Sequence, residues 1–152
     1  MKTRFLFLCL ALAPALSPAD EGRHLSVPLL PAYQQECAAC HIAYPPGLLP
    51  AASWQRISQN LAKHYGSDAS LDPATVAQLS QWLTAHAGNG KRAREAPPED
   101  RITRSAWFIR EHDEVPAATW KRASIKSAAN CAACHGGAEQ GDFNEHRIRI
   151  PK

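Results

Sequence analysis

The chain has 152 residues, of which 45% are hydrophobic and 20% charged, and its formal net charge is +3. This length suits one domain or two very small ones and excludes a large multidomain enzyme, while the hydrophobic share excludes disorder throughout. Five cysteines and seven histidines are the unusual part of this composition.

The first 19 residues have the pattern of a secretory signal peptide. Lys2 and Arg4 precede an apolar run over residues 5–16, and small residues follow up to Ala19. The run is shorter than the roughly 20 apolar residues of a membrane span, so an uncleaved anchor is the less favoured alternative. We therefore predict that residues 1–19 are a signal peptide, that the mature protein is periplasmic, and that it has no stable membrane span.

Cleavage at this point changes the composition that matters for function. The remaining 15 Lys and Arg against 14 Asp and Glu give a net charge of +1, which argues against nucleic acid as a partner. Met1, the only methionine, would leave with the signal peptide. Cys9 would leave too, so that four cysteines remain in two pairs.

The first half of the mature chain predicts three helices. The first covers 31–41 and the second 54–65, with Ser53 as its N-cap. The third runs over 72–87, where Asp-Pro opens an apolar periodic segment. Three prolines within 44–50 exclude a regular helix there, so this stretch is expected to be a loop.

The second half is expected to be helical but less regular. Residues 88–100 are rich in Gly, Pro and charge and predict a solvated linker, followed by helices over 103–114 and 117–130. The tail over 136–152 has no long period, and no segment predicts a strand. The fold class is therefore all-α with long loops, in two haem-sized domains, 20–90 and 101–152, joined by a linker, 91–100.

The sequence Cys-Ala-Ala-Cys-His occurs twice, at 37–41 and at 131–135. This is the attachment motif of c-type haem: cysteines three apart lie on one face of a helical turn and can bond one edge of the porphyrin, and the next histidine ligates the iron. Export of the chain is consistent with this chemistry. We predict two covalently bound haem c groups, with thioether links from Cys37, Cys40, Cys131 and Cys134 and proximal iron ligands His41 and His135.

Other interpretations of the cysteine pairs explain less. A zinc ribbon needs pairs roughly 15–20 residues apart, and a thioredoxin-like redox pair needs a βαβ pattern beside it. Two ordinary disulfides suit an exported chain. None of these alternatives explains why a histidine follows both pairs.

A distal iron ligand cannot be methionine once Met1 is removed, which leaves a second histidine, a rarer ligand such as lysine, or an open position. His64 shares the apolar face of its expected helix, and His86 does the same on the next helix and is its rival. His112 follows two aromatic residues, and His146 in the tail is its rival. His64 could instead be a core histidine bonded to a carbonyl, and His24 is expected to be solvated.

Several further stretches resemble the small dihaem cytochromes c of bacterial periplasms. Besides the two haem motifs, they are Tyr44-Pro-Pro-Gly-Leu-Leu-Pro50, His64-Tyr65-Gly66, Trp107-Phe108, His112 and Trp120. The resemblance implies an amino-terminal lobe like a class I cytochrome c, a less regular helical carboxyl-terminal lobe, and two bis-histidine haems. Carried over by position, it favours His64 over His86 and His112 over His146 as distal ligands.

These observations predict an electron-transfer carrier rather than an enzyme. The resemblance implies that its partners are other periplasmic or membrane-bound cytochromes, bound transiently. The alternative is a ligand-binding or catalytic haem protein with one open iron site. Lys91, Arg92 and Arg94 are either a solvated linker or a docking spot for an acidic partner. Arginines that could pair with haem propionates, none of them assigned by the sequence, are Arg101, Arg104 and Arg110.

Overall fold

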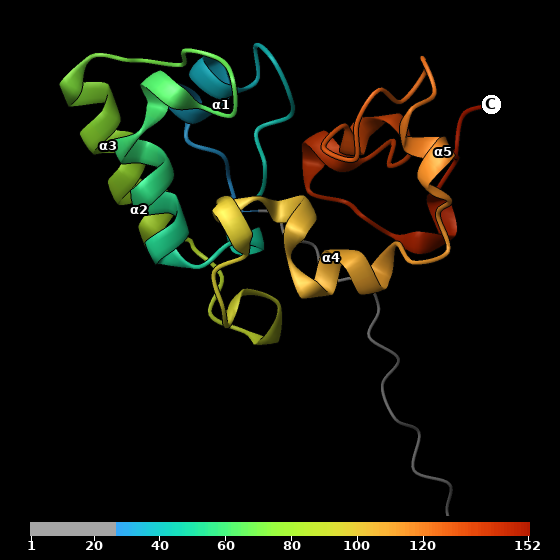
Figure 1. The fold of residues 1–152 in the computed structure, drawn as a ribbon. Helices are drawn as coiled ribbons and strands as arrows, with labels where there is room; N and C mark the ends of the chain where they lie inside the picture. Colours follow the sequence, from blue (N-terminus) through green and yellow to red (C-terminus); the bar gives the residue numbers. More distant parts are fainter. Residues whose placement is uncertain (1–26) are drawn as a thin grey trace, which may run out of the picture.

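The computed structural model describes residues 27–152, so the predicted signal peptide lies outside the described residues. Over this range the chain is helical, with three isolated bridges and no strand, as the all-α prediction required. Figure 1 shows two lobes, one built on α1, α2 and α3 and the other containing α5. Within 27–152 there is no helix with the length and apolarity needed to cross a membrane.

The first lobe has three α-helices and a side-chain core. They are α1 (Pro31–Cys37), α2 (Ala51–Gln59) and α3 (Pro73–Ala85), with α2 and α3 packed side by side (Figure 1). The start of α3 confirms that Asp72-Pro73 opens this helix, and the Asp72 side chain caps it by accepting hydrogen bonds from the backbone N–H groups of Ala74 and Thr75. The core consists of Tyr33, Ala43, Leu49, Trp54, Leu79 and Leu83.

The predicted bounds of the first two helices were wrong. Helix α1 ends at Cys37, and the chain turns before the motif histidine, whose ring Nδ1 lies 2.7 Å from the carbonyl oxygen of Ile42. Helix α2 begins at Ala51 and ends at Gln59, so Ser53 is a fully buried residue of its first turn and not its cap. Gly66, at φ +100°, serves a separate turn after His64.

The segment expected to be a solvated linker packs partly on the first lobe. The Gly88 N–H donates to the Leu49 carbonyl over 2.8 Å, and a Cβ at Gly88 would lie 2.4 Å from the Gly47 carbonyl oxygen, so only glycine fits. Ala93 is 4% exposed. The cationic side chains Lys91, Arg92 and Arg94 remain exposed, in agreement with a solvated surface.

The second lobe is built from short turns. Its α-helices are α4 (Ala106–Glu111) and α5 (Ala117–Trp120), so the predicted helices 103–114 and 117–130 were too long. After α5 the chain continues in turns, where Lys126 has φ 70° and the Asn130 side-chain amide donates to the Ile125 carbonyl oxygen. Eight 3₁₀ turns complete the described chain: Pro46–Leu48, Leu61–Lys63, Lys91–Ala93, Pro98–Asp100, Ile102–Arg104, Cys131–Ala133, Ala138–Gln140 and Glu145–Arg147.

Candidate haem sites

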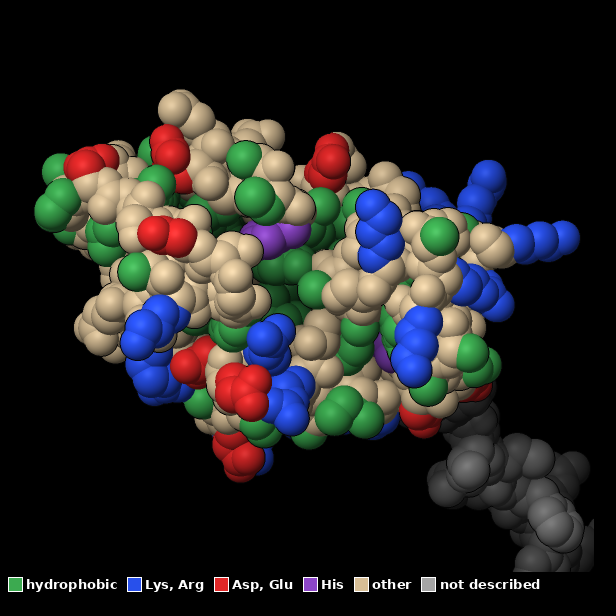
Figure 2. All heavy atoms as spheres, turned by 45° about the horizontal axis from the view of Figure 1, so that its top comes forward, with side chains coloured by type: hydrophobic (Ala, Val, Ile, Leu, Met, Phe, Trp, Pro, Cys, Tyr) green, Lys and Arg blue, Asp and Glu red, His purple; other side chains and the backbone are tan. Residues whose placement is uncertain are grey.

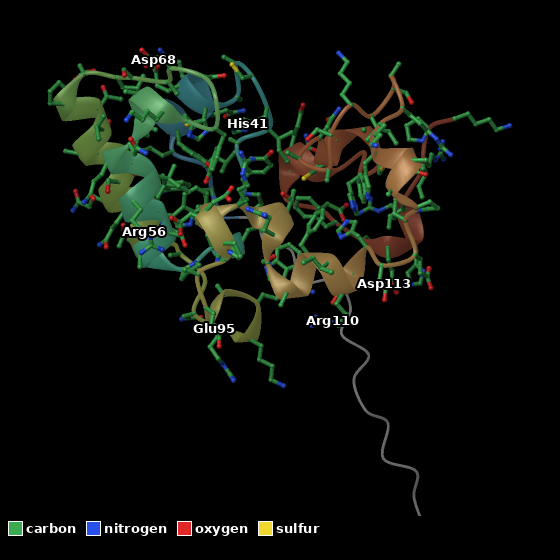
Figure 3. The ribbon with its side chains drawn as sticks, viewed as in Figure 1. His41, Arg56, Asp68, Glu95, Arg110 and Asp113 are labelled. Carbon is green, nitrogen blue, oxygen red and sulfur yellow. The ribbon has the colours of Figure 1, made fainter. Side chains whose placement is uncertain are left out.

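The first motif histidine faces a second histidine from a distant part of the chain. The ring centres of His41 and His64 lie 6.1 Å apart, and the ring planes are inclined by 27°. His41 follows α1, whereas His64 stands at the end of the 3₁₀ turn that continues α2. Figure 3 shows His41 between the two lobes. The predicted proximal and distal residues of the first site are therefore neighbours in space.

A cavity of about 480 Å³ accompanies this pair. Its wall contains both cysteines of the first motif, both histidines of the pair and mostly apolar side chains, including Leu49, Trp54, Ile57, Leu61, Val76, Leu79 and Leu83. Figure 2 shows a hollow with hydrophobic walls and histidine at its side. A large apolar space with thiols at its edge and imidazoles facing each other fits a covalently attached porphyrin.

The surroundings of His41 and His64 favour a ring nitrogen with a free lone pair, which is the form that binds a metal. The Nδ1–H of His41 donates to the Ile42 carbonyl oxygen, so its Nε2 carries the lone pair. Burial lowers the pKa of His64, and the charges of His41 and Arg101 lower it further. Both effects favour the neutral imidazole that binds iron.

The second motif repeats the arrangement with a different ring geometry. His112 and His135 also lie 6.1 Å apart between ring centres, but their planes are inclined by 73°. The Nδ1–H of His112 donates over 2.9 Å to the Phe108 carbonyl, and the Phe108 ring stacks on the imidazole at 4.0 Å. Burial and the neighbouring His112 lower the pKa of His135. In both sites the paired histidines are 23 positions apart in sequence, in opposite order.

The rival histidines lie elsewhere. The Nδ1 of His86 is 2.8 Å from the Trp82 carbonyl oxygen, and its ring packs against Trp82. The side chain of His146 is 86% exposed beside Glu145. The structure brings His64 and His112, and neither rival, next to a motif histidine.

The motif thiols do not have the environment of catalytic cysteines. Burial raises the pKa of the Cys37 and Cys131 thiols to about 11, which keeps them protonated near neutral pH. Among residues 27–152, His, Cys, Asp and Glu side chains form no group of three or more suited to a metal ion, which a zinc module would require.

Tyr44 connects the two sites, a role that the sequence did not indicate. Its ring stacks on His41 with 4.6 Å between ring centres, and its hydroxyl donates over 2.7 Å to the Ala129 carbonyl oxygen. Ala129 lies two residues before Cys131, and both line the first cavity. Burial, followed by the charge of Cys131, raises the pKa of Tyr44, so the hydroxyl keeps its proton. The sequence signals were its place three residues after His41 and its position at the start of the Tyr44–Pro50 stretch that carries the family resemblance.

Two covalent haem motifs, each with a second imidazole opposite its own, define a c-type cytochrome with two haem sites. The family model of dihaem cytochrome c matches residues 33–143, and the chain belongs to this family. The protein therefore carries two haem c groups, as its two motifs predicted.

Solved structures agree with this assignment. The dihaem cytochrome c of Shewanella baltica OS155 superposes with a TM-score of 0.71 at 39% identity, covering 80% of this chain and 92% of that one. Two structures from Rhodobacter sphaeroides give TM-scores of 0.68 and 0.66 at 43% identity, covering 77% and 75% of this chain and 98% and 96% of theirs. A comparison with curated proteins gives no match.

Proposed function

We propose that this protein is a periplasmic electron-transfer carrier in which both irons are low-spin and bound by two histidines. The observation that carries the proposal is the 6.1 Å separation of ring centres in both histidine pairs. Imidazoles bound to one metal from opposite sides, each through a bond of about 2 Å, have ring centres roughly 6 Å apart once the ring radius is added. His64 and His112 are the proposed distal ligands.

When bound, each haem supplies a one-electron ferric/ferrous couple. The groups of this chain would hold the iron ligands of each haem in place. The carbonyls of Ile42 and Phe108 hold the rings of His41 and His112 in one tautomer and orientation. With two imidazoles on each metal, no coordination position is left for oxygen, peroxide or nitrite, and the lack of a methionine ligand favours low potentials. This chemistry supports a carrier and not an enzyme.

We propose other periplasmic or membrane-bound cytochromes as transient partners. The exposed cations Lys91, Arg92 and Arg94 support a weak electrostatic contact with an acidic surface. Arg92 also lies over the ring of Trp107, at 5.8 Å, which ties this segment to the start of α4. Periplasmic location rests on the sequence of residues 1–19.

Electron paramagnetic resonance of the oxidised protein tests the ligation directly. We expect two low-spin ferric signals: a rhombic one from the near-parallel pair, and a strongly anisotropic one from the pair inclined by 73°. Carbon monoxide added to the reduced protein should bind to neither haem. Rapid stoichiometric binding at either haem would support the alternative, a ligand-binding or catalytic protein with one open iron site.

Histidine variants identify the ligands. His64→Ala should convert the first haem to a carbon-monoxide-binding form and leave the second unchanged, and His112→Ala should do the reverse. His86→Ala and His146→Ala are the matched controls and should leave both spectra unchanged, because the His86 ring packs on Trp82 and the His146 side chain is exposed, and neither faces a motif histidine. A low-spin spectrum that survives His64→Ala or His112→Ala would remove that residue from the ligand set.

A further inference from the structure

Arg101 is the arginine that lines the first cavity among the described residues. Its Nε–H donates over 3.2 Å to a carboxylate oxygen of Glu99, and its guanidinium lies 4.3 Å from the centre of the Tyr65 ring. Within residues 27–152 its two terminal nitrogens have no hydrogen-bond partner. A guanidinium presents its donors as a planar fork that matches a carboxylate.

The other arginines of this region form ion pairs and do not line the cavity. Arg56 makes two hydrogen bonds to Asp100, of 2.8 and 2.6 Å. Arg104 pairs with Glu99 on the exposed surface, and Arg110 pairs with Glu111. None of these three lines the cavity. Of the arginines that could pair with a haem propionate, the geometry therefore singles out Arg101.

The backbone around Arg101 is held in place from both sides. The Tyr65 hydroxyl lies within hydrogen-bond distance of the Glu99 and Asp100 carbonyl oxygens, at 3.0 and 3.2 Å, and Asp100 is anchored to α2 through Arg56. Figure 3 shows Arg56 on α2. Tyr65, Glu99 and Asp100 all have φ between 51° and 57°, a conformation that non-glycine residues adopt at a cost. Such strain gathers where a structure holds a group in a functional position.

We propose that Arg101 anchors a carboxylate of the first haem and raises the reduction potential of that haem. The proposal deepens the proposed function and rests on it. An iron that gains an electron loses one unit of positive charge, so a fixed cation at the cavity wall stabilises the reduced form. Because the Arg101 side chain is 40% exposed, solvent screens this effect, and it stays local to the first site.

The test is a redox titration of the intact dihaem protein followed by electron paramagnetic resonance, which separates the two haems by their ligand-plane angles. Arg101→Gln should lower the equilibrium constant for reduction of the first haem roughly three- to tenfold, where tenfold is about 59 mV for one electron, and leave the second unchanged. Arg101→Lys, which keeps the charge but not the fork, should restore most of the potential.

Arg104→Gln is the matched control. It removes one charge and one partner of the same Glu99 but lies outside the cavity, so both potentials should stay at their original values. An unchanged first haem in Arg101→Gln, an equal fall in both haems, or an Arg104→Gln shift as large as that of Arg101→Gln would each overturn the proposal. Failure of the proposed function would show separately, as carbon monoxide binding to the unsubstituted protein.

Discussion

The two lobes present the same pair of facing histidines on different amounts of protein structure. The first lobe has three α-helices and a cluster of six buried apolar side chains around its cavity. The second lobe has two short α-helices, α4 with six residues and α5 with four, and 3₁₀ turns, with Ile125 as its fully buried large side chain. The comparison teaches that a haem-attachment motif and a pair of facing imidazoles can be presented by very different amounts of helix and side-chain core.

The difference also predicts how each lobe depends on its cofactor. A chain of this size buries little apolar surface, and a covalently bound macrocycle adds a large apolar face to pack against. In the first lobe that face adds to a side-chain core between α2 and α3. In the second lobe it meets few buried apolar side chains.

The largest expected effect is the loss of haem attachment. With Cys37, Cys40, Cys131 and Cys134 all replaced by serine, we expect the protein to be largely unfolded and to lose most of its helical far-ultraviolet circular dichroism. Replacing only Cys131 and Cys134 should leave the circular dichroism signal of α2 and α3. Replacing only Cys37 and Cys40 should lower the helical signal more. Native helix content in the form that lacks both pairs would break the comparison.

A buried side chain in each lobe gives a sharper test. Ile125 is 0% exposed, and Ile125→Ala should cost about 2–5 kcal/mol of the second lobe's unfolding free energy through the cavity it leaves. Native-state hydrogen exchange measures the unfolding free energy of each lobe separately. Leu49→Ala, at a site 1% exposed in the first lobe, is the control and should lower protection there. If Ile125→Ala lowered protection equally in both lobes, they would be one cooperative unit.

The smallest expected effect concerns the cap of α3. Hydrogen bonds from the Thr75 side chain and then its backbone lower the pKa of Asp72, so this contribution to stability is present above the pKa of the unfolded state and is lost as pH falls through the folded value. On acidification, the unfolding free energy of the first lobe, measured by thermal unfolding, should therefore fall more in the unsubstituted protein than in Asp72→Ala. Asp72→Asn, which caps without titrating, should lose as little as Asp72→Ala. Equal acid sensitivity in all three would refute the role of Asp72.

The sequence by itself determined the features that need only neighbouring residues. The two Cys-Ala-Ala-Cys-His motifs specify haem attachment because five consecutive residues supply both thiols and one ligand. The start of α3 at Asp72-Pro73 was equally local, since Asp72 and the N–H groups it accepts from lie within four residues. The overlong helix predicted over 117–130 shows the limit, because Ser and Asn side chains there bond the backbone in turns that periodicity does not reveal.

Only the tertiary structure decided which histidine faces which. His64 and His86 were both expected on apolar helix faces, but the tertiary structure brings only the His64 ring to His41, 23 positions earlier, whereas His86 bonds the Trp82 carbonyl four positions before it. The contact of Tyr44 with Ala129, 85 positions away, likewise depends on how the lobes meet. Such contacts join residues far apart in the chain, and their geometry follows from the packing of whole elements, which no local pattern of residues encodes.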